Sequence, residues 1–313
     1  MNKRFYAMIA LAIALVLPIL MLSNYTNTGA DPLGSGEYEG FLYTFDGTDA
    51  TITEYTGSLT DIEIPGEVNG KTVVAIGNNS FGNKTFLNSV IIPDSVTSIG
   101  GGAFNCCVNL TTVSIGGGVE SIGGGAFNCC IGLTSVIIPD NVRSLDNAAF
   151  MRCANLTSIS LGNGVEFIGS SAFSECASLT SVEIPDSVKI IDNTAFSQCK
   201  NLSSVTIGSG VESIGNATFM GCTNLSSVTI KNGVGSILNA TFSECTSLTS
   251  IDIPDSVESI GSGAFSQCTS LASVIIGDGV KSVGGGAFYG CTNLSSVIIG
   301  DGVETIDNQM FSG

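Results

Sequence analysis

Apolar and polar positions recur along this chain with a period of 23 residues. A fixed period of this length is typical of a solenoid, in which one small unit cannot bury its apolar side alone and stacks on its neighbours. The pattern therefore predicts one elongated body over most of the chain, and not two ordinary globular domains. The period is marked by Phe81, Phe104, Phe127, Phe150, Phe173, Phe196, Phe219, Phe242, Phe265, Phe288 and Phe311.

The apolar positions within one unit predict a strand, a corner and a return segment. A leucine six residues after each phenylalanine starts the motif L-x-x-V-x-I, whose end alternates as a β-strand does. Pro-Asp-Ser or Gly-Asp-Gly then turns the chain. A valine and a second aliphatic residue three positions later are expected to point inward. The segment G-x-x-A-F-x-x-C-x-x-L brings the chain back, and its spacing of three predicts a short helical turn.

The chain ahead of the first full unit predicts a cap. Side chains alternate around Asp46-Gly47, a dipeptide that favours a tight turn, so we expect a hairpin with strands at about residues 41–45 and 50–54. A five-residue insertion near residues 69–70 predicts a surface bulge in the first repeat. The aromatic side chains of the hairpin would shield the apolar end of the stack from water. They are Phe41, Tyr43, Phe45 and Tyr55.

The first 30 residues have the pattern of an export signal. Lys3 and Arg4 precede an apolar run over residues 7–22, and small and polar residues follow. The run is interrupted by Pro18 and is short for a spanning helix, which needs roughly 20 residues. We interpret residues 1–30 as a signal peptide or, alternatively, as an uncleaved N-terminal anchor. Either interpretation places the repeats outside the cytoplasm, in an extracellular or cell-surface location, with membrane contact only through an uncleaved segment.

Charge and composition exclude several classes of function. The formal net charge is −17, so the surface would repel the phosphates of nucleic acids, and no nucleic-acid partner is expected. The chain has no histidine. Its absence removes Ser-His and Cys-His nucleophile pairs and the commonest ligand of transition metals. The sequence therefore predicts neither an enzyme nor a cofactor-binding site.

Two of the units carry a specific resemblance. Residues 264–285, AFSQCTSLASVIIGDGVKSVGG, and 241–262, TFSECTSLTSIDIPDSVESIGS, resemble the BspA-type leucine-rich repeat of surface proteins from anaerobic bacteria, some archaea and mucosal protozoa. The resemblance covers roughly residues 38–313. It implies a leucine-rich-repeat solenoid, formally α/β and dominated by short parallel strands, with an N-terminal β-hairpin cap. Several family members are similar to adhesins that bind host matrix proteins, but no single residue carries that activity.

The pattern and the resemblance together predict three parts. Residues 1–30 are the signal peptide or anchor, residues 31–57 a linker and the hairpin cap, and residues 58–313 the BspA-type repeats. Ten stacked units at roughly 4.8 Å each give a rod or shallow arc about 50 Å long.

One cysteine per unit forms a ladder along the stack. Stacked equivalent positions hold their Cβ atoms roughly 4.8 Å apart, whereas a disulfide prefers about 3.8 Å, so we interpret the ladder as buried, unbridged thiols. Spacing by 23 residues provides none of the clustered ligands that zinc needs, and no metal site is predicted. Cys106 and Cys129 stand one residue out of phase, near the surface. The ladder comprises Cys107, Cys130, Cys153, Cys176, Cys199, Cys222, Cys245, Cys268 and Cys291.

Asp and Glu recur at the corners of the units. A calcium ladder would need six or more converging oxygens and the nonapeptide of calcium-binding β-rolls, which is missing. We therefore interpret these acids as solvated edges of the stack.

The phase of the strand locates a candidate binding face. In T-S-V-x-I the side chains that flank the inward valine face outward, so each unit offers two hydroxyl residues and one variable position. Exposed isoleucines on a hydroxyl-rich sheet are typical of a protein-binding face. The alternative is that β-branched residues only stabilise the sheet. The candidate residues are Ile91, Ile137, Glu183, Thr206, Thr229, Asp252, Ile275 and Ile298.

These features favour a non-enzymatic secreted or cell-surface binding protein. Its expected role is adhesion or recognition of an extracellular protein or glycan through the sheet face. The alternative is a structural component of the cell envelope that self-associates, because the sequence ends partway through a unit without a polar cap over the last apolar layer.

Overall fold

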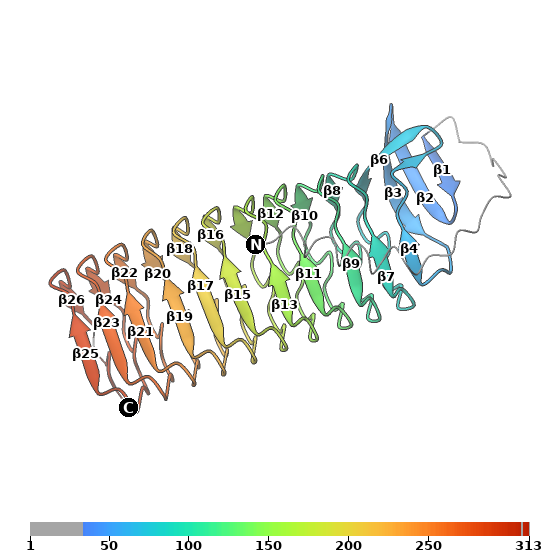
Figure 1. The fold of residues 1–313 in the computed structure, drawn as a ribbon. Coiled ribbons are helices and arrows are strands. Elements are labelled where there is room, and N and C mark those ends of the chain that lie inside the picture. The colour runs from blue at the N-terminus through green and yellow to red at the C-terminus, as the bar shows by residue number, and fades with distance from the viewer. Residues whose placement is uncertain (1–33, 308, 313) are drawn as a thin grey trace, which may run out of the picture.

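The computed structural model describes residues 34–307 and 309–312. In this range the chain winds into an elongated solenoid whose turns stack along one axis, with antiparallel strands at its N-terminal end (Figure 1). The predicted leucine-rich-repeat solenoid of short parallel strands is confirmed. The described residues contain no helix, and so none long and apolar enough to cross a membrane. Residues 1–30, predicted to be a signal peptide or anchor, lie outside the described range.

One side of the solenoid is formed by the strands that the motif L-x-x-V-x-I predicts. They pair in parallel, one strand per turn, in four short sheets. The first sheet contains β4 (Asp61–Glu63), β7 (Ser89–Ile91) and β9 (Thr112–Ser114), and the second contains β11 (Ser135–Ile137) and β13 (Ser158–Ser160). The third contains β15 (Ser181–Ile184), β17 (Ser204–Ile207) and β19 (Ser227–Ile230), and the fourth contains β21 (Ser250–Ile253), β23 (Ser273–Ile276) and β25 (Ser296–Ile299).

A second side is one long sheet that runs from the cap to the last turn. The sequence predicts that the valine and aliphatic residue after each corner point inward, and both are buried in most turns, but it predicts no strand there. The parallel members are β6 (Lys71–Ile76), β8 (Ser98–Ile99), β10 (Ser121–Ile122), β12 (Ser144–Leu145), β14 (Phe167–Ile168), β16 (Ile190–Ile191), β18 (Ser213–Ile214), β20 (Ser236–Ile237), β22 (Ser259–Ile260), β24 (Ser282–Val283) and β26 (Thr305–Ile306).

The third side, which we call the turn side, is the return segment from glycine to leucine. The prediction of a short helical turn in this segment is wrong. Its backbone N–H groups alternate between a carbonyl three residues back in the same turn and a carbonyl of the next turn. Asn128 N donates to Gly125 O three residues back at 3.0 Å, whereas Cys129 N donates to Met151 O on the next turn at 2.8 Å. Gly125 and Cys129 also have φ of 64° and 57°, a left-handed conformation that interrupts any helix.

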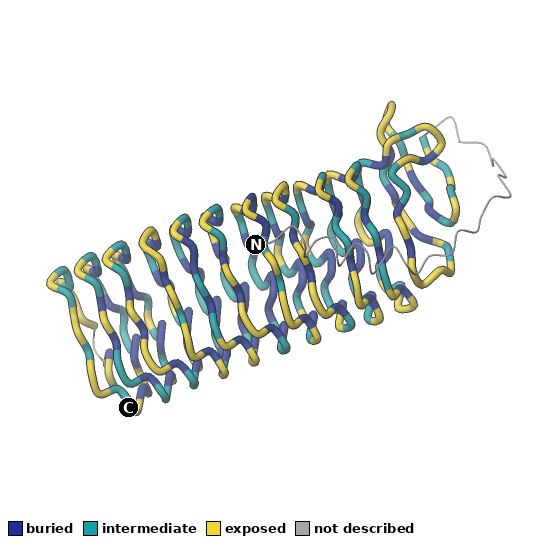
Figure 2. The backbone as a smooth tube through the Cα atoms, in the orientation of Figure 1, coloured by how far each residue is buried: buried dark blue, intermediate teal, exposed yellow. Residues whose placement is uncertain are grey.

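The core is a column of stacked rings and aliphatic side chains inside these three sides. The phenylalanine rings of neighbouring turns lie nearly parallel, as with Phe104 and Phe127, whose centroids are 5.1 Å apart and whose planes differ by 6°. Both rings are fully buried. Figure 2 shows buried and exposed positions alternating along the strands around this core. The distance of about 5 Å is also the spacing between turns, which places equivalent residues of successive units in columns.

The N-terminal cap has one strand more than predicted. The hairpin of β2 (Phe41–Asp46) and β3 (Asp49–Tyr55) turns at Gly47, as expected, and β1 (Ser35–Tyr38) adds a third antiparallel strand. Three of the four cap aromatic residues are buried, and the fourth, Phe45, packs partly against the core. The predicted bulge is a second hairpin, in which β5 (Glu67–Val68) pairs antiparallel with β6 across Asn69-Gly70.

Candidate binding surface

The residues of the predicted binding face form one column along the four short sheets. Each stands at the outward position between two inward residues, as in β15, where exposed and buried residues alternate. Adjacent members pair directly, for example Glu183 with Thr206 and Ile275 with Ile298. We call this the variable column. It comprises Ile91, Ser114, Ile137, Ser160, Glu183, Thr206, Thr229, Asp252, Ile275 and Ile298, of which Ile91, Ser114 and Thr206 are half-buried and the others exposed.

Beside the variable column runs a line of serine hydroxyls. In the last three of the four short sheets, these side chains point outward from the first residue of each strand, and within the described residues their hydroxyls make no hydrogen bond to the protein. At a spacing of about 5 Å per turn they form a regular row of donors and acceptors open to a partner. We call it the serine column; its members are Ser135, Ser158, Ser181, Ser204, Ser227, Ser250, Ser273 and Ser296.

A second hydroxyl in most units serves the fold instead. Thr180 Oγ1 donates to Thr157 O at 3.2 Å, and Ser203 Oγ donates to Thr180 O at 2.9 Å, each one turn back. The sequence predicts two available hydroxyl residues per unit. In most units, however, the second hydroxyl is already bound to the backbone of the preceding turn. The serine column and the variable column therefore remain available to a partner, and together we call them the serine face.

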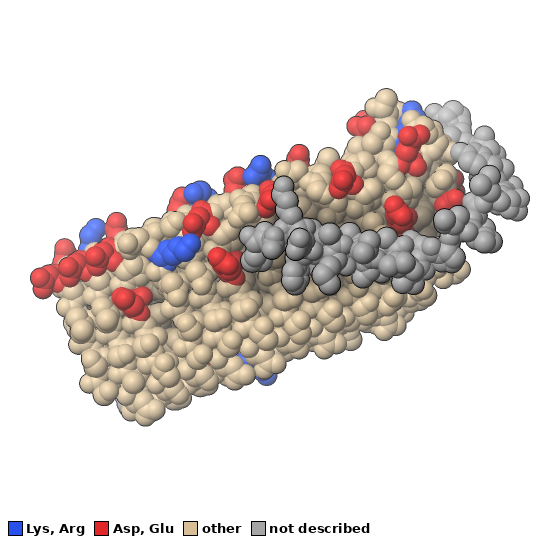
Figure 3. Space-filling model, in the orientation of Figure 1, with Lys and Arg blue, Asp and Glu red and all other residues tan. Residues whose placement is uncertain are grey.

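Charged side chains gather elsewhere. In Figure 3 the acidic and basic residues cluster along the edge next to β8–β26, and the visible part of the serine face is mostly uncharged. Exposed ion pairs between neighbouring turns occur there, such as Lys281 Nζ with Glu258 Oε2 at 2.9 Å and Arg143 with Glu166 at 4.0 Å. Exposed pairs of this kind contribute between about 0 and 1 kcal/mol each to stability.

The corner aspartates connect successive turns. Asp94 Oδ1 accepts a hydrogen bond from Gly117 N at 2.7 Å, and Asp186 Oδ1 accepts one from Ser209 N at 2.8 Å. This backbone N–H, together with Lys231, lowers the pKa of Asp186. The described part of the chain contains no group of three or more His, Cys, Asp or Glu placed to hold a metal ion.

Two hollows are lined by residues outside the serine column and the variable column. One of about 350 Å³ is at the last turns and is lined mostly by apolar side chains, including Phe288, Leu294 and Phe311. Another of about 350 Å³ lies against the long sheet and is lined by Gly124, Asp146, Asn147, Phe167 and Asp192. The two aspartates stand on turns separated by an intervening one, at Gly169, so they do not form a close carboxylate pair.

Comparison with protein-family models identifies the type of repeat in this solenoid. The family model described as the BspA type leucine rich repeat region, in six copies, matches residues 74–203 and 189–313. The chain belongs to the BspA-type leucine-rich repeat family. No curated protein matches it.

Solved structures include other leucine-rich repeat proteins that resemble this BspA-type chain. The T. pallidum leucine rich repeat protein is 27% identical, with a TM-score of 0.53, over 68% of this chain and 90% of its own. A leucine rich cell surface protein of Faecalibacterium prausnitzii is 27% identical, with a TM-score of 0.40, over 86% of this chain and 95% of its own. The first of these similarities supports the leucine-rich-repeat fold.

The cysteine ladder is part of the core of the BspA-type array. All ladder thiols are buried and unbridged, as the sequence predicts. Each donates its S–H to the carbonyl of a phenylalanine one turn back, for example Cys199 to Phe173 O and Cys222 to Phe196 O, both at 3.2 Å. Burial raises the pKa of Cys199 well above its ordinary value, and it raises the pKa of Cys222 to about 12.

We expect native-state labelling to separate the two kinds of cysteine. With iodoacetamide at mildly alkaline pH, Cys199 and Cys222 should stay unmodified in the folded protein because little thiolate forms and no reagent reaches them. The half-exposed Cys106 and Cys129 should react, and all eleven cysteines should react after unfolding in urea. Mass spectrometry of the digested protein measures each site. Rapid native labelling of Cys199 or Cys222 would contradict the buried ladder.

Proposed function

We propose that this chain is a non-enzymatic binding protein of the cell surface or extracellular space, which recognises an extracellular protein or glycan through its serine face. The observation that carries the proposal is the serine column, a row of outward hydroxyls without hydrogen-bond partners among the described residues. Membership of the BspA-type family and the export pattern of residues 1–30 support the location. Adhesion is the role that we infer for such a surface.

The side chains of the variable column favour a protein partner. Ile137, Ile275 and Ile298 are 41%, 43% and 58% exposed, so a partner that covers them gains hydrophobic burial in addition to hydrogen bonds from the serines. Glu183 and Asp252 add two exposed negative charges between these apolar positions. A complementary partner surface would present apolar side chains and one or two basic residues. A glycan partner would instead use mainly the hydroxyl row.

Two exposed isoleucines of equal exposure provide a test with a matched control. Ile275 lies on the serine face at 43% exposure, and Ile190 lies on the long sheet at 44%. The full chain would be tested against immobilised matrix proteins, glycans and whole cells, beside an unrelated acidic protein. We expect Ile275→Asp to weaken binding at least about tenfold, a loss of about 1.4 kcal/mol, and Ile190→Asp to leave it unchanged. Binding no better than that of the acidic protein, or equal losses in both variants, would refute the proposal.

The alternative function, self-association in the cell envelope, rests on a different surface. The last described layer leaves Ile299, Ile306 and Phe311 38%, 53% and 45% exposed, beside the hollow at the last turns. End-to-end stacking of a second copy would cover these side chains. Light scattering of the full chain should then show mass growing with concentration, and Ile306→Asp should abolish that growth. A constant monomer mass at high concentration would exclude this alternative.

A further inference from the structure

Two thiols outside the ladder occupy equivalent positions on neighbouring turns. Cys106 and Cys129 each follow a core phenylalanine by two residues, with φ of 56° and 57°, and both are half-exposed. The rings of Phe104 and Phe127 stack at 5.1 Å with nearly parallel planes, so these two turns are in register. The two thiol side chains therefore leave the turn side from matching backbone positions, one turn spacing apart.

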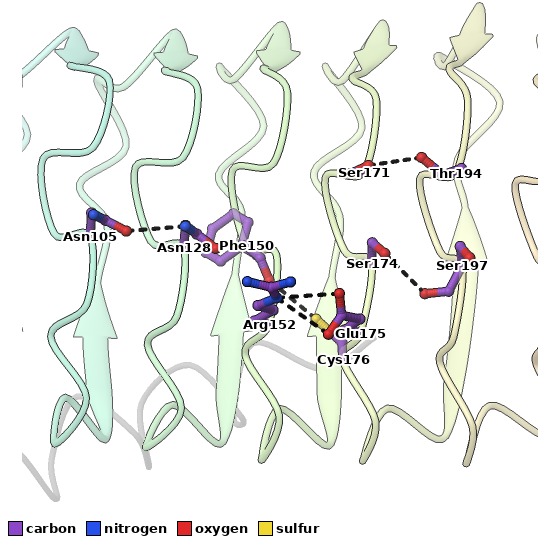
Figure 4. Close-up of polar contacts among 10 residues, drawn as sticks. All are labelled: Asn105, Asn128, Phe150, Arg152, Ser171, Ser174, Glu175, Cys176, Thr194 and Ser197. Carbon is purple, nitrogen blue, oxygen red and sulfur yellow. Dashed lines mark hydrogen bonds and ion pairs between the residues drawn. The ribbon is translucent and has the colours of Figure 1, made fainter.

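Hydrogen bonds hold the two turns together at this point. Cys106 N donates to Asn128 O at 2.8 Å, and Asn128 Nδ2 donates to Asn105 Oδ1 at 3.1 Å (Figure 4). Asn105 Oδ1 also accepts the thiol of Cys106, with Sγ at 3.5 Å. Backbone hydrogen bonds and one pair of side-chain amides thus fix the spacing between these two turns. The thiols of Cys106 and Cys129 do not belong to the buried cysteine ladder.

Side chains in this column reach from one turn to the next. On the next two turns, the positions equivalent to Cys129 hold Arg152 and Glu175, whose Nε and Oε1 atoms are 3.2 Å apart (Figure 4). Further along, the amide of Gln198 fills the space where a Cβ on Gly221 would lie. Contact between Cys106 and Cys129 follows the same geometry. Neither can pair with its chain neighbour, because the ladder thiols point into the core.

The spacing permits a disulfide but does not favour a relaxed one. Cα atoms about 5 Å apart fall inside the usual range of roughly 4.4–6.8 Å, whereas Cβ atoms at the turn spacing must approach by about 1 Å to reach the usual 3.8 Å. An exposed, somewhat strained disulfide is easily reduced and belongs to the labile, exchangeable class. Cys107 and Cys130 have the same spacing, but their thiols are buried and bound to carbonyls.

We propose that Cys106 and Cys129 form a reversible dithiol–disulfide site on the turn side, whose substrates are low-molecular-weight disulfides. One cysteine thiolate attacks a sulfur of the external disulfide, forms a mixed disulfide and releases the first external thiolate, which takes up a proton. The second cysteine, as its thiolate, then displaces the second external thiolate. Two protein thiols are oxidised to one S–S bond, and one external disulfide is reduced to two thiols.

Exchange with oxidised glutathione tests the site in the full-length chain. The reduced protein would be incubated with the disulfide, quenched in acid, denatured, alkylated and cut after glutamate. Glu120 separates Cys106 from Cys129, whereas cutting at lysine and arginine would leave residues 85–143 in one peptide. We expect the two peptides to be joined, with the loss of two hydrogen atoms and with every ladder cysteine alkylated. Because burial and the neighbouring Cys129 raise the pKa of Cys106, exchange should accelerate as the pH rises.

Single-cysteine variants distinguish a working pair from two separate thiols. In Cys106→Ser, Cys129 should retain glutathione as a stable mixed disulfide, because the resolving thiol is missing, and Cys129→Ser should do the same at Cys106. In the natural chain, reduced glutathione in excess should reopen the internal bond. The proposal is overturned if the natural chain keeps glutathione on either thiol without an internal bond, if neither thiol reacts, or if the bond forms with Cys107 or Cys130.

Discussion

Phe196→Ala is expected to destabilise the solenoid by about 3–5 kcal/mol. The ring is fully buried and lies between two others, with centroids 5.2 Å from Phe173 and 5.4 Å from Phe219. Its removal opens a cavity that both neighbouring turns share. The surrounding backbone cannot collapse into the space, because three sides of hydrogen-bonded turns hold it at a fixed spacing.

Urea unfolding, followed by circular dichroism, measures this loss. Ser181→Ala is the control, since its hydroxyl is exposed and makes no hydrogen bond to any residue that the structure describes, and we expect a change within about 0.5 kcal/mol. The ladder adds a local probe, because Cys222 donates its S–H to Phe196 O. Native labelling of Cys222 should become faster in Phe196→Ala and not in Ser181→Ala. Equal destabilisation by both changes would mean that the inside and outside of the strands are reversed.

The sequence predicts most of the inside and outside of this molecule, because a stack places every unit in the same environment. Leu202, Val205 and Ile207 follow the motif and are all buried. The long sheet is less evident, since a strand of only two residues, such as Ser213–Ile214, is too short to show an alternation. The left-handed conformation two residues after each phenylalanine from Phe81 to Phe288 is not evident from the sequence either, because that position holds residues as different as Cys129 and Arg152.

The sequence also leaves part of the candidate binding surface unpredicted. Thr180 and Ser181 are adjacent hydroxyl residues, both exposed, and nothing in their chemistry separates them. Only the direction of each side chain decides that Thr180 bonds to the preceding turn and that Ser181 remains open to a partner. The variable column was predicted from the phase of the strand, and the structure places its members in one line. Its role in binding stays a proposal.

Some units have glycine at the corner where others have Pro-Asp-Ser. Whether such a glycine can be replaced depends on contacts between turns, which the repeat pattern does not reveal. A Cβ on Gly118 would lie closer than 3.0 Å to the backbone oxygen of Asp94, on the preceding turn. The equivalent residue of that preceding turn is Ser95, so comparison of units alone suggests that a side chain is tolerated here. Gly117, the adjacent residue, differs, because its nearest neighbour would be Asp94 Oδ1 at 3.7 Å.

Gly118→Ala should therefore destabilise the protein by about 1–3 kcal/mol, the usual cost of forcing extra volume into a packed site, because the new methyl group must push two hydrogen-bonded turns apart. Gly117→Ala is the matched control one residue away. It keeps the N–H that donates to Asp94 Oδ1 and should change the stability by less than about 0.5 kcal/mol. Urea midpoints of the two variants, compared with the natural chain, provide the measurement. If the two alanines proved equally harmless, the corners would not nest as closely as the structure shows, and the spacing of the whole stack would have to be set by the phenylalanine column alone.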